Sequence, residues 1–354
     1  MNQLAYFYAT SGLGDGKTRW INIAKGLGIF LVVVGHFHPA NSPAYWSALN
    51  TLIYTFHMPL FFFISGYLYK YTKKNYANSL KVKFQRLGIP FLTIALIYFL
   101  LKLTASYFVK LDYPVTLNSI LKLLDNPVQS FVPLLWFVHA LLGIFLIYPI
   151  LRSILRPLII LIISLLAAIL VDSSQISVPF FSHAIRNMPY FAFGVVCIDY
   201  LNKINQYTLK FNKIFFLFLV VIIILNFTFQ NLTHFTLEAM SAKYLQGVMG
   251  ILAVVSLSMA LETRFESAQT RWIELVGICS MSIYLFHTIF ESVIRIIFFK
   301  YLNIYLIPFS IVALFAIFAG LFVPMFMEVS LLRRSNLLAK LFLGLKLTNK
   351  YNFK

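Results

Sequence analysis

The chain lacks the composition of a soluble domain. Only 11% of its residues are charged, 60% are hydrophobic, and acidic side chains number only 11. It has no internal repeat, no Gly/Ser-rich or Pro-rich linker, and no small-residue cleavage site after its first apolar run. These absences argue against a large soluble core and predict that the first apolar run is retained as a membrane span.

Cysteine is also scarce. Cys197 and Cys279 both lie in or beside apolar segments, so we expect them to pack without forming a disulfide. The histidines have no His-x-x-x-His spacing and no accompanying carboxylates, so we expect no metal site.

Ten apolar runs have the length that a bilayer requires. We therefore predict an all-α, polytopic integral membrane protein with about ten transmembrane helices in a single domain over residues 1–354. The predicted spans are 20–38, 51–69, 88–109, 131–150, 156–171, 179–198, 213–230, 243–261, 273–298 and 305–327.

The excess of basic side chains, 29 against 11 acidic, is concentrated in alternate loops and in the tail 329–354. In a soluble protein this excess would suggest nucleic-acid binding, but between membrane spans it sets orientation. We expect no nucleic-acid partner, both termini in the cytoplasm, and a short basic tail near the inner leaflet.

The first predicted span contains two ionisable side chains, Lys25 and His36, among apolar residues and glycine. Ionisable groups within a span are energetically expensive and usually serve function. The two residues are eleven positions apart, roughly three helical turns, so they share one helix face about 16 Å apart. Gly26, Gly28 and Gly35 in the same span are expected to allow close helix packing.

Further ionisable groups are predicted at the depth of His36, in the outer half of the bilayer. A histidine within a span is commonly a hydrogen-bonding residue between helices, and an arginine near a span end commonly extends to the headgroups. Both roles are therefore alternatives to a functional site. The four groups are His57, His139, Arg186 and His287.

Five sequence blocks resemble the acyltransferase-3 family of bacterial membrane enzymes, particularly the branch related to fucose 4-O-acetylase and O-antigen O-acetyltransferases. The spacing Lys25-x10-His36 is similar to the family's Arg/Lys-x10-His signature. The other blocks follow in the family's order: Phe56-His57-Met58-Pro59 through Ser65-Gly66-Tyr67, Arg86-Leu-Gly-Ile-Pro90, Trp136-Phe137, and Ser280-Met-Ser282-Ile-Tyr284-Leu-Phe-His287. The chain departs from the family at Asn22, where most members carry an acidic residue. We expect no soluble hydrolase-like domain of the kind that some relatives carry.

The resemblance implies transfer of an acetyl group from acetyl-CoA to a sugar hydroxyl of a surface polysaccharide or its lipid-linked precursor, in the bacterial inner membrane. Besides membrane lipids, the expected partners are acetyl-CoA as co-substrate and the glycan acceptor, with no bound cofactor. His36 is the expected general base, because imidazole has an unperturbed pKa of about 6.5. Lys25 is expected at the phosphate-bearing end of CoA, with Arg86, Ser282 and Tyr284 as further donor-binding residues. The acceptor or its supporting polar layer is expected to involve His57, His139, Trp136, Arg186, His287 and Ser65.

Three alternatives stay open from the sequence. A transporter or flippase for a lipid-linked glycan would also use several spans and buried histidines, with Glu274, Glu291 and Arg295 as its candidate proton-coupled site. The same chemistry with another donor such as succinyl-CoA fits equally well, and a purely structural membrane subunit is the third alternative.

Overall fold

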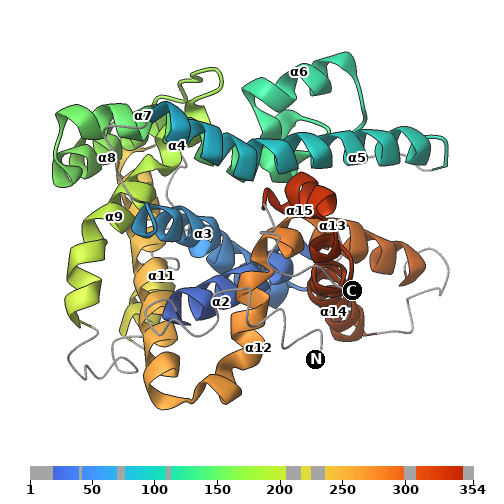
Figure 1. The fold of residues 1–354 in the computed structure, drawn as a ribbon. Coiled ribbons are helices and arrows are strands. Elements are labelled where there is room, and N and C mark those ends of the chain that lie inside the picture. The colour runs from blue at the N-terminus through green and yellow to red at the C-terminus, as the bar shows by residue number, and fades with distance from the viewer. Residues whose placement is uncertain are drawn as a thin grey trace. The chain divides into compact units, whose positions relative to one another are not determined.

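The computed structural model describes residues 19–39, 42–69, 76–108, 113–204, 217–224, 236–298 and 308–345. Within these ranges the chain is built from helices joined by short connections, and no strand occurs in them (Figure 1). The chain divides into two compact units, one formed by residues 1–64 and 198–330 and the other by residues 65–197 and 331–354.

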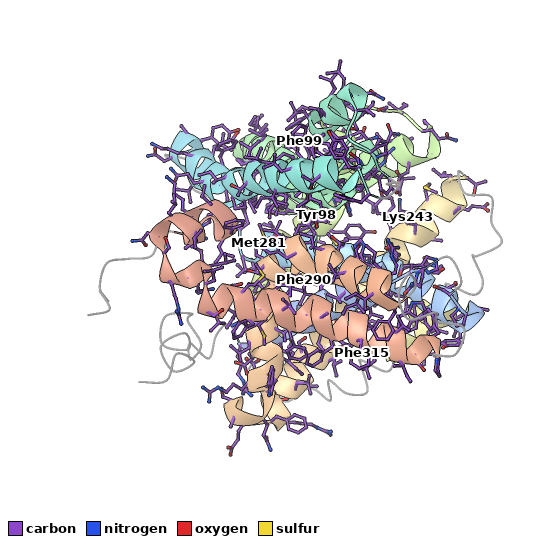
Figure 2. All side chains as sticks on the ribbon, turned by 90° about the vertical axis from the view of Figure 1, so that its right-hand side faces the viewer. Tyr98, Phe99, Lys243, Met281, Phe290 and Phe315 are labelled. Atoms are coloured by element: carbon purple, nitrogen blue, oxygen red, sulfur yellow. The ribbon has the colours of Figure 1, made fainter. Side chains whose placement is uncertain are left out.

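The first unit is organised around its N-terminal helix α2, drawn in dark blue in Figure 1, which packs against α11, α12, α13 and α14. Thr236 accepts a hydrogen bond from Ala239 and so caps α11, and a capping box of Glu266 and Gln269 starts α12. Figure 2 shows Phe290 on α13 and Phe315 on the neighbouring α14. The helices of this unit are α2 (Arg19–His36), most of α3 (Ala44–Tyr67), α11 (Leu237–Arg264), α12 (Ser267–Ile278), α13 (Ser280–Ile296) and α14 (Phe309–Ser330).

Two glycines allow α2 and α12 to approach at backbone distance. A Cβ atom on Gly26 would collide with the carbonyl oxygen of Ile273, and one on Gly277 would collide with the carbonyl oxygen of Asn22. Gly28 and Gly35 likewise face side chains of α3. These contacts agree with the helix-packing role predicted for Gly26, Gly28 and Gly35.

The N-terminal end of α2 is fixed by the guanidinium group of Arg19. Its Nε donates to Glu274 at 3.0 Å, and its terminal nitrogens donate to the carbonyl oxygens of Glu262 and Phe265 and to the hydroxyl of Thr270. Thr270 also bonds to the Glu274 carboxylate. This network ties α2 to the C-terminal end of α11 and to α12.

The predicted span 273–298 is not one straight helix. It breaks at Cys279, where α12 and α13 meet at an angle of 70°. Cys279 has φ −81° and ψ 8°, outside the helical region. The close approach of Gly277 to Asn22 holds the end of α12 against α2, so α13 continues in a different direction.

The second unit contains the remaining helices. Pro157 at the first position starts α8, and Gly344 with φ +62° ends α15 in a left-handed turn that presses against the backbone of Arg86. The helices are α4 (Tyr76–Lys83), α5 (Ile89–Ala105), α6 (Leu117–Asp125), α7 (Trp136–Ile154), α8 (Pro157–Ser173), most of α9 (Ser182–Ile204) and α15 (Asn336–Leu343). Shorter helical turns are η2 (Phe84–Gly88), η3 (Pro127–Gln129), η4 (Pro133–Leu135) and η7 (Leu332–Arg334).

Five helical stretches among the described residues are long and apolar enough to cross a membrane. The bent pair α12–α13 adds a sixth if it acts as one span. The chain is therefore a helical, multi-pass membrane protein. The predicted span 213–230 falls mostly outside the described residues, of which 217–224 are helical. The five stretches are Ala44–Tyr67, Tyr76–Ala105, Pro133–Ile154, Leu237–Arg264 and Phe309–Arg334.

Candidate active site

Histidines from three helices of the first unit meet around Tyr54. The ring of His36, the last residue of α2, lies 5.0 Å from the ring of His287 on α13 in an edge-on arrangement. The Tyr54 ring on α3 lies 6.1 Å from His36 and 4.9 Å from His57. The structure thus brings together three of the five polar groups that the sequence predicts at one depth.

Backbone carbonyl groups set the tautomers of two of these imidazoles. His287 Nδ1 lies 2.9 Å from the carbonyl oxygens of Ile283 and Tyr284, and His57 Nδ1 lies 2.8 Å from that of Ile53. A carbonyl oxygen only accepts, so each Nδ1 is the donor, and in the neutral ring Nε2 is then a bare acceptor. One such acceptor therefore belongs to the His287 ring beside His36, and the other belongs to the His57 ring beside Tyr54.

The side chains of this group differ in how much of their surface is exposed. His57 and His287 are 3% and 0% exposed, whereas Tyr54 is 51% exposed and His36 is half-buried. His36 and Tyr54 are thus the members of this group that have exposed surface, and the other two imidazoles have almost none.

Lys25 lies on α2 three turns before His36, as the sequence spacing predicts. Its side chain is half-buried, and no hydrogen bond or ion pair joins it to another of the described residues. The neighbouring Gly26 lies against the backbone of Ile273. The two ionisable groups of α2 thus occupy opposite ends of one helix.

Ser282 and Tyr284, the predicted donor-binding residues of α13, are both buried. The Ser282 hydroxyl donates to the Glu328 carboxylate on α14 at 2.6 Å, which joins the two helices. Tyr284 contributes its carbonyl oxygen to the bond that orients His287. In this structure both residues serve the geometry of α13, and their part in donor binding stays a prediction.

The other predicted residues belong to the second unit. His139 Nε2 lies 2.8 Å from the Leu124 carbonyl oxygen, and the Arg186 Nε lies 2.6 Å from the Asp172 carboxylate. The ion pair gives Arg186 a protein partner, which the headgroup interpretation did not foresee. Three further residues complete the predicted set. Ser65 is half-buried, the indole of Trp136 lies beside the ring of His183, and Arg86 is exposed in the π-helical turn η2.

The second unit also contains a pocket of about 570 Å³. His139 forms part of its wall, and its Nδ1 has no hydrogen-bond partner among the described residues. The Lys83 ammonium group, also in the wall, lies 4.3 Å from the centre of the Phe145 ring. The remaining lining side chains are mostly apolar, including Phe84, Phe91, Leu92 and Phe180.

Sequence reasoning did not assign Asn50, Tyr54 or Glu328 to a site, and it assigned Glu291 only to the transporter alternative. In the structure Tyr54 lies beside His36 and His57, Glu328 bonds to Ser282, and Asn50 and Glu291 are buried. Asn50, Tyr54 and His57 are spaced by four and three residues, so they share one helix face, and that spacing was the available signal. No group of three or more His, Cys, Asp or Glu within the described ranges has the arrangement of a metal site.

Comparison with known proteins gives one match. Residues 18–329, nearly the whole chain and parts of both units, match the model of the acyltransferase-3 family, described as an acyltransferase domain. A search of curated proteins and a search of solved structures each returned no match.

Proposed function

The chain belongs to the acyltransferase-3 family, and we propose that this membrane acyltransferase moves an acetyl group from acetyl-CoA to a sugar hydroxyl. The acceptor is a surface polysaccharide, such as O-antigen, capsule or exopolysaccharide, or its lipid-linked precursor in the bacterial inner membrane. The observation that carries the proposal is the partly exposed imidazole of His36, edge-on to the buried His287 and three turns from Lys25.

In the proposed reaction, the sugar oxygen attacks the thioester carbonyl carbon while His36 takes its proton. A carbon–oxygen bond forms, the carbon–sulfur bond breaks, and His36 returns the proton to the leaving thiolate of CoA. The products are an acetylated sugar and free CoA. The Nε2 atoms of His287 and His57 carry no hydrogen. They can accept a hydrogen bond from the sugar hydroxyl or from protonated His36, whereas they cannot donate one to an anion.

A direct test uses the purified full-length chain in lipid vesicles with acetyl-CoA and surface glycan extracted from the source bacterium. The proposal predicts release of free CoA thiol together with a stable acetyl ester on the glycan. If the chain consumes succinyl-CoA and not acetyl-CoA, the donor would be corrected to succinyl-CoA and the acyl-transfer reaction would stand. Failure to consume any acyl-CoA, with glycan movement across the vesicle membrane, would replace the enzyme with the transporter alternative.

The two carboxylates of the transporter alternative differ in this structure. Glu274 is engaged by Arg19 and Thr270 at the end of α2, which suits an anchor better than a proton carrier. Glu291 lies one turn after His287 on α13, and its Oε1 has no hydrogen-bond partner among the described residues. The structure therefore gives the transporter alternative no specific support.

We propose that Lys25 binds the phosphate-bearing end of CoA as a point charge. Arginine at this position keeps the positive charge, so Lys25→Arg should retain most of the activity, whereas Lys25→Ala should raise the KM for acetyl-CoA by about tenfold or more. The measurement is initial thiol release against acetyl-CoA concentration. Equal losses in the two variants, or an unchanged KM in Lys25→Ala, would contradict the electrostatic role.

The proposed topology has ten spans with both termini in the cytoplasm. It is supported by the distribution of lysine and arginine between alternate loops. A reporter fused after Lys354 should be active only in the cytoplasm. Activity on the outer side of the membrane would show that the number of spans is odd.

A further inference from the structure

Three buried side chains near His36 carry polar atoms that have no hydrogen-bond partner among the described residues. These atoms are both amide atoms of Asn50, Nε2 of His287 and Oε1 of Glu291. The residues are only 4%, 0% and 5% exposed, respectively. An unpaired polar group inside a protein is costly and rare, so three of them on α3 and α13, the two helices that contribute His57 and His287 to the site, indicate a polar ligand.

Asn50 lies at the His36 end of the site. Gly35 contacts Ile53 and Tyr54, while Gly28 contacts Leu60, so α2 and α3 run in opposite directions. Asn50 precedes Ile53 and Tyr54 on α3 and therefore lies near or beyond the C-terminal end of α2. That is the end away from Lys25, where the proposed donor places its phosphates.

Glu291 lies one turn after His287 on α13 and borders the same site. A Cβ atom on Gly320 of α14 would lie 3.0 Å from Oε1 of Glu291 and 3.0 Å from Val33, so the glycine leaves room for the carboxyl group. Glu291 is also close enough to Tyr54 to interact with it electrostatically. The carboxyl group thus lies beside Gly320 of α14, one turn along α13 from His287.

We infer that Asn50, Glu291 and the bare Nε2 of His287 form the subsite for the acceptor sugar. The inference rests on the proposed function and deepens it by naming residues that hold the sugar ring. Each sugar hydroxyl both donates and accepts a hydrogen bond. An amide supplies one donor and one acceptor function, and a carboxyl oxygen and a bare imidazole nitrogen accept, so the set matches neighbouring hydroxyls of one ring. The thioester arm of the donor carries fewer such groups and is assigned to the Lys25 side.

The test compares wild type with Asn50→Leu and Glu291→Leu, using acetyl-CoA as donor and methyl glycopyranosides as acceptor probes. A parent glycoside that stimulates thiol release is compared with its monodeoxy derivatives. The subsite predicts that both variants lose about 10- to 100-fold in kcat/KM for the parent glycoside, the range for one unpaired buried polar group. Thiol release without acceptor should change less than about twofold, because the donor is bound elsewhere.

Two further readouts separate binding from folding. Wild type should discriminate against at least one deoxy derivative, and Glu291→Leu should lose that discrimination, because leucine has no atom that can accept the same hydrogen bond. Asn50→Leu should melt at the wild-type temperature or higher, since it removes a buried unpaired amide. Thr51→Ala, at the exposed neighbouring position on α3, is the matched control and should change neither property.

Several results would overturn the subsite. One is an unchanged kcat/KM in both variants, which would mean that these groups hold only water. Another is a failure of every glycoside to stimulate thiol release by wild type, while thiol release without acceptor persists. An absence of thiol release from wild type under all conditions would instead contradict the proposed function itself. The two failures are therefore distinguishable.

Discussion

Replacing His36 by alanine is expected to lower the rate of acetyl transfer by about 10²- to 10⁴-fold, the usual contribution of a general base. The other two imidazoles are not expected to substitute, because the rings of His57 and His287 are only 3% and 0% exposed. The measurement is the initial rate of thiol release with glycan acceptor. The fold should be unaffected, since the His36 ring is half-buried at the end of α2.

His38 provides the matched control for this prediction. It lies two residues further along the chain and is exposed, so His38→Ala should keep the wild-type rate. Comparable losses in the two variants would indicate a local disturbance of the connection between α2 and α3. A His36→Ala variant with full activity would remove His36 from the mechanism.

Gly277→Ala is expected to destabilise the first unit strongly. The added Cβ atom would collide with the Asn22 carbonyl oxygen and approach the backbone nitrogen of Gly26, and backbone atoms within packed helices cannot move aside easily. Overpacking of this kind costs about 1–3 kcal/mol, and more where the backbone must shift. Thermal unfolding of the detergent-solubilised chain should therefore occur at a clearly lower temperature than in wild type.

Gly35→Ala is the comparison for this variant. Its Cβ atom would approach side-chain atoms of Ile53 and Tyr54 at 3.3 and 3.4 Å, and side chains can adjust by a few tenths of an ångström. Its melting temperature should stay close to that of wild type. If Gly277→Ala melts like wild type, the close contact between α2 and α12 is wrong.

The membrane class and the first helix were predictable because each follows from a local pattern. Apolar runs of span length indicate helices, and the spacing of Lys25 and His36 places both on one face regardless of what surrounds the helix. Lone glycines in such a helix indicate close packing, and Gly26 shows it. These inferences need no knowledge of which other helices are neighbours.

The break at Cys279 could not be read from the chain. The run 273–298 has no proline, and the 70° bend arises where Gly277 meets the backbone of Asn22, far away in sequence. Hydropathy reports whether a segment is apolar, and says nothing about a partner helix that redirects it. The apolar run alone therefore predicts one long span.

The polar partners of the site were the least predictable part. The bond from Ser282 to Glu328 and the approach of Glu291 to Gly320 join residues on α13 and α14, and nothing in either helix alone indicates the pairing. Likewise, predicted depth grouped His36, His57 and His287 correctly with one another. It also included His139 and Arg186, whose described partners, Leu124 and Asp172, lie in the second unit. Predicted depth gives the position of a residue along the membrane normal only, whereas a site also depends on which helices are neighbours in the membrane plane.

The most direct test of the central claim is mass spectrometry of surface glycan from a deletion strain complemented with wild type or with His36→Ala at matched expression. The account predicts that wild type restores a mass increment of one acetyl group and that His36→Ala does not. An unchanged glycan mass with a reduced amount of surface glycan in the deletion strain would contradict it, and would identify the chain as a transporter instead.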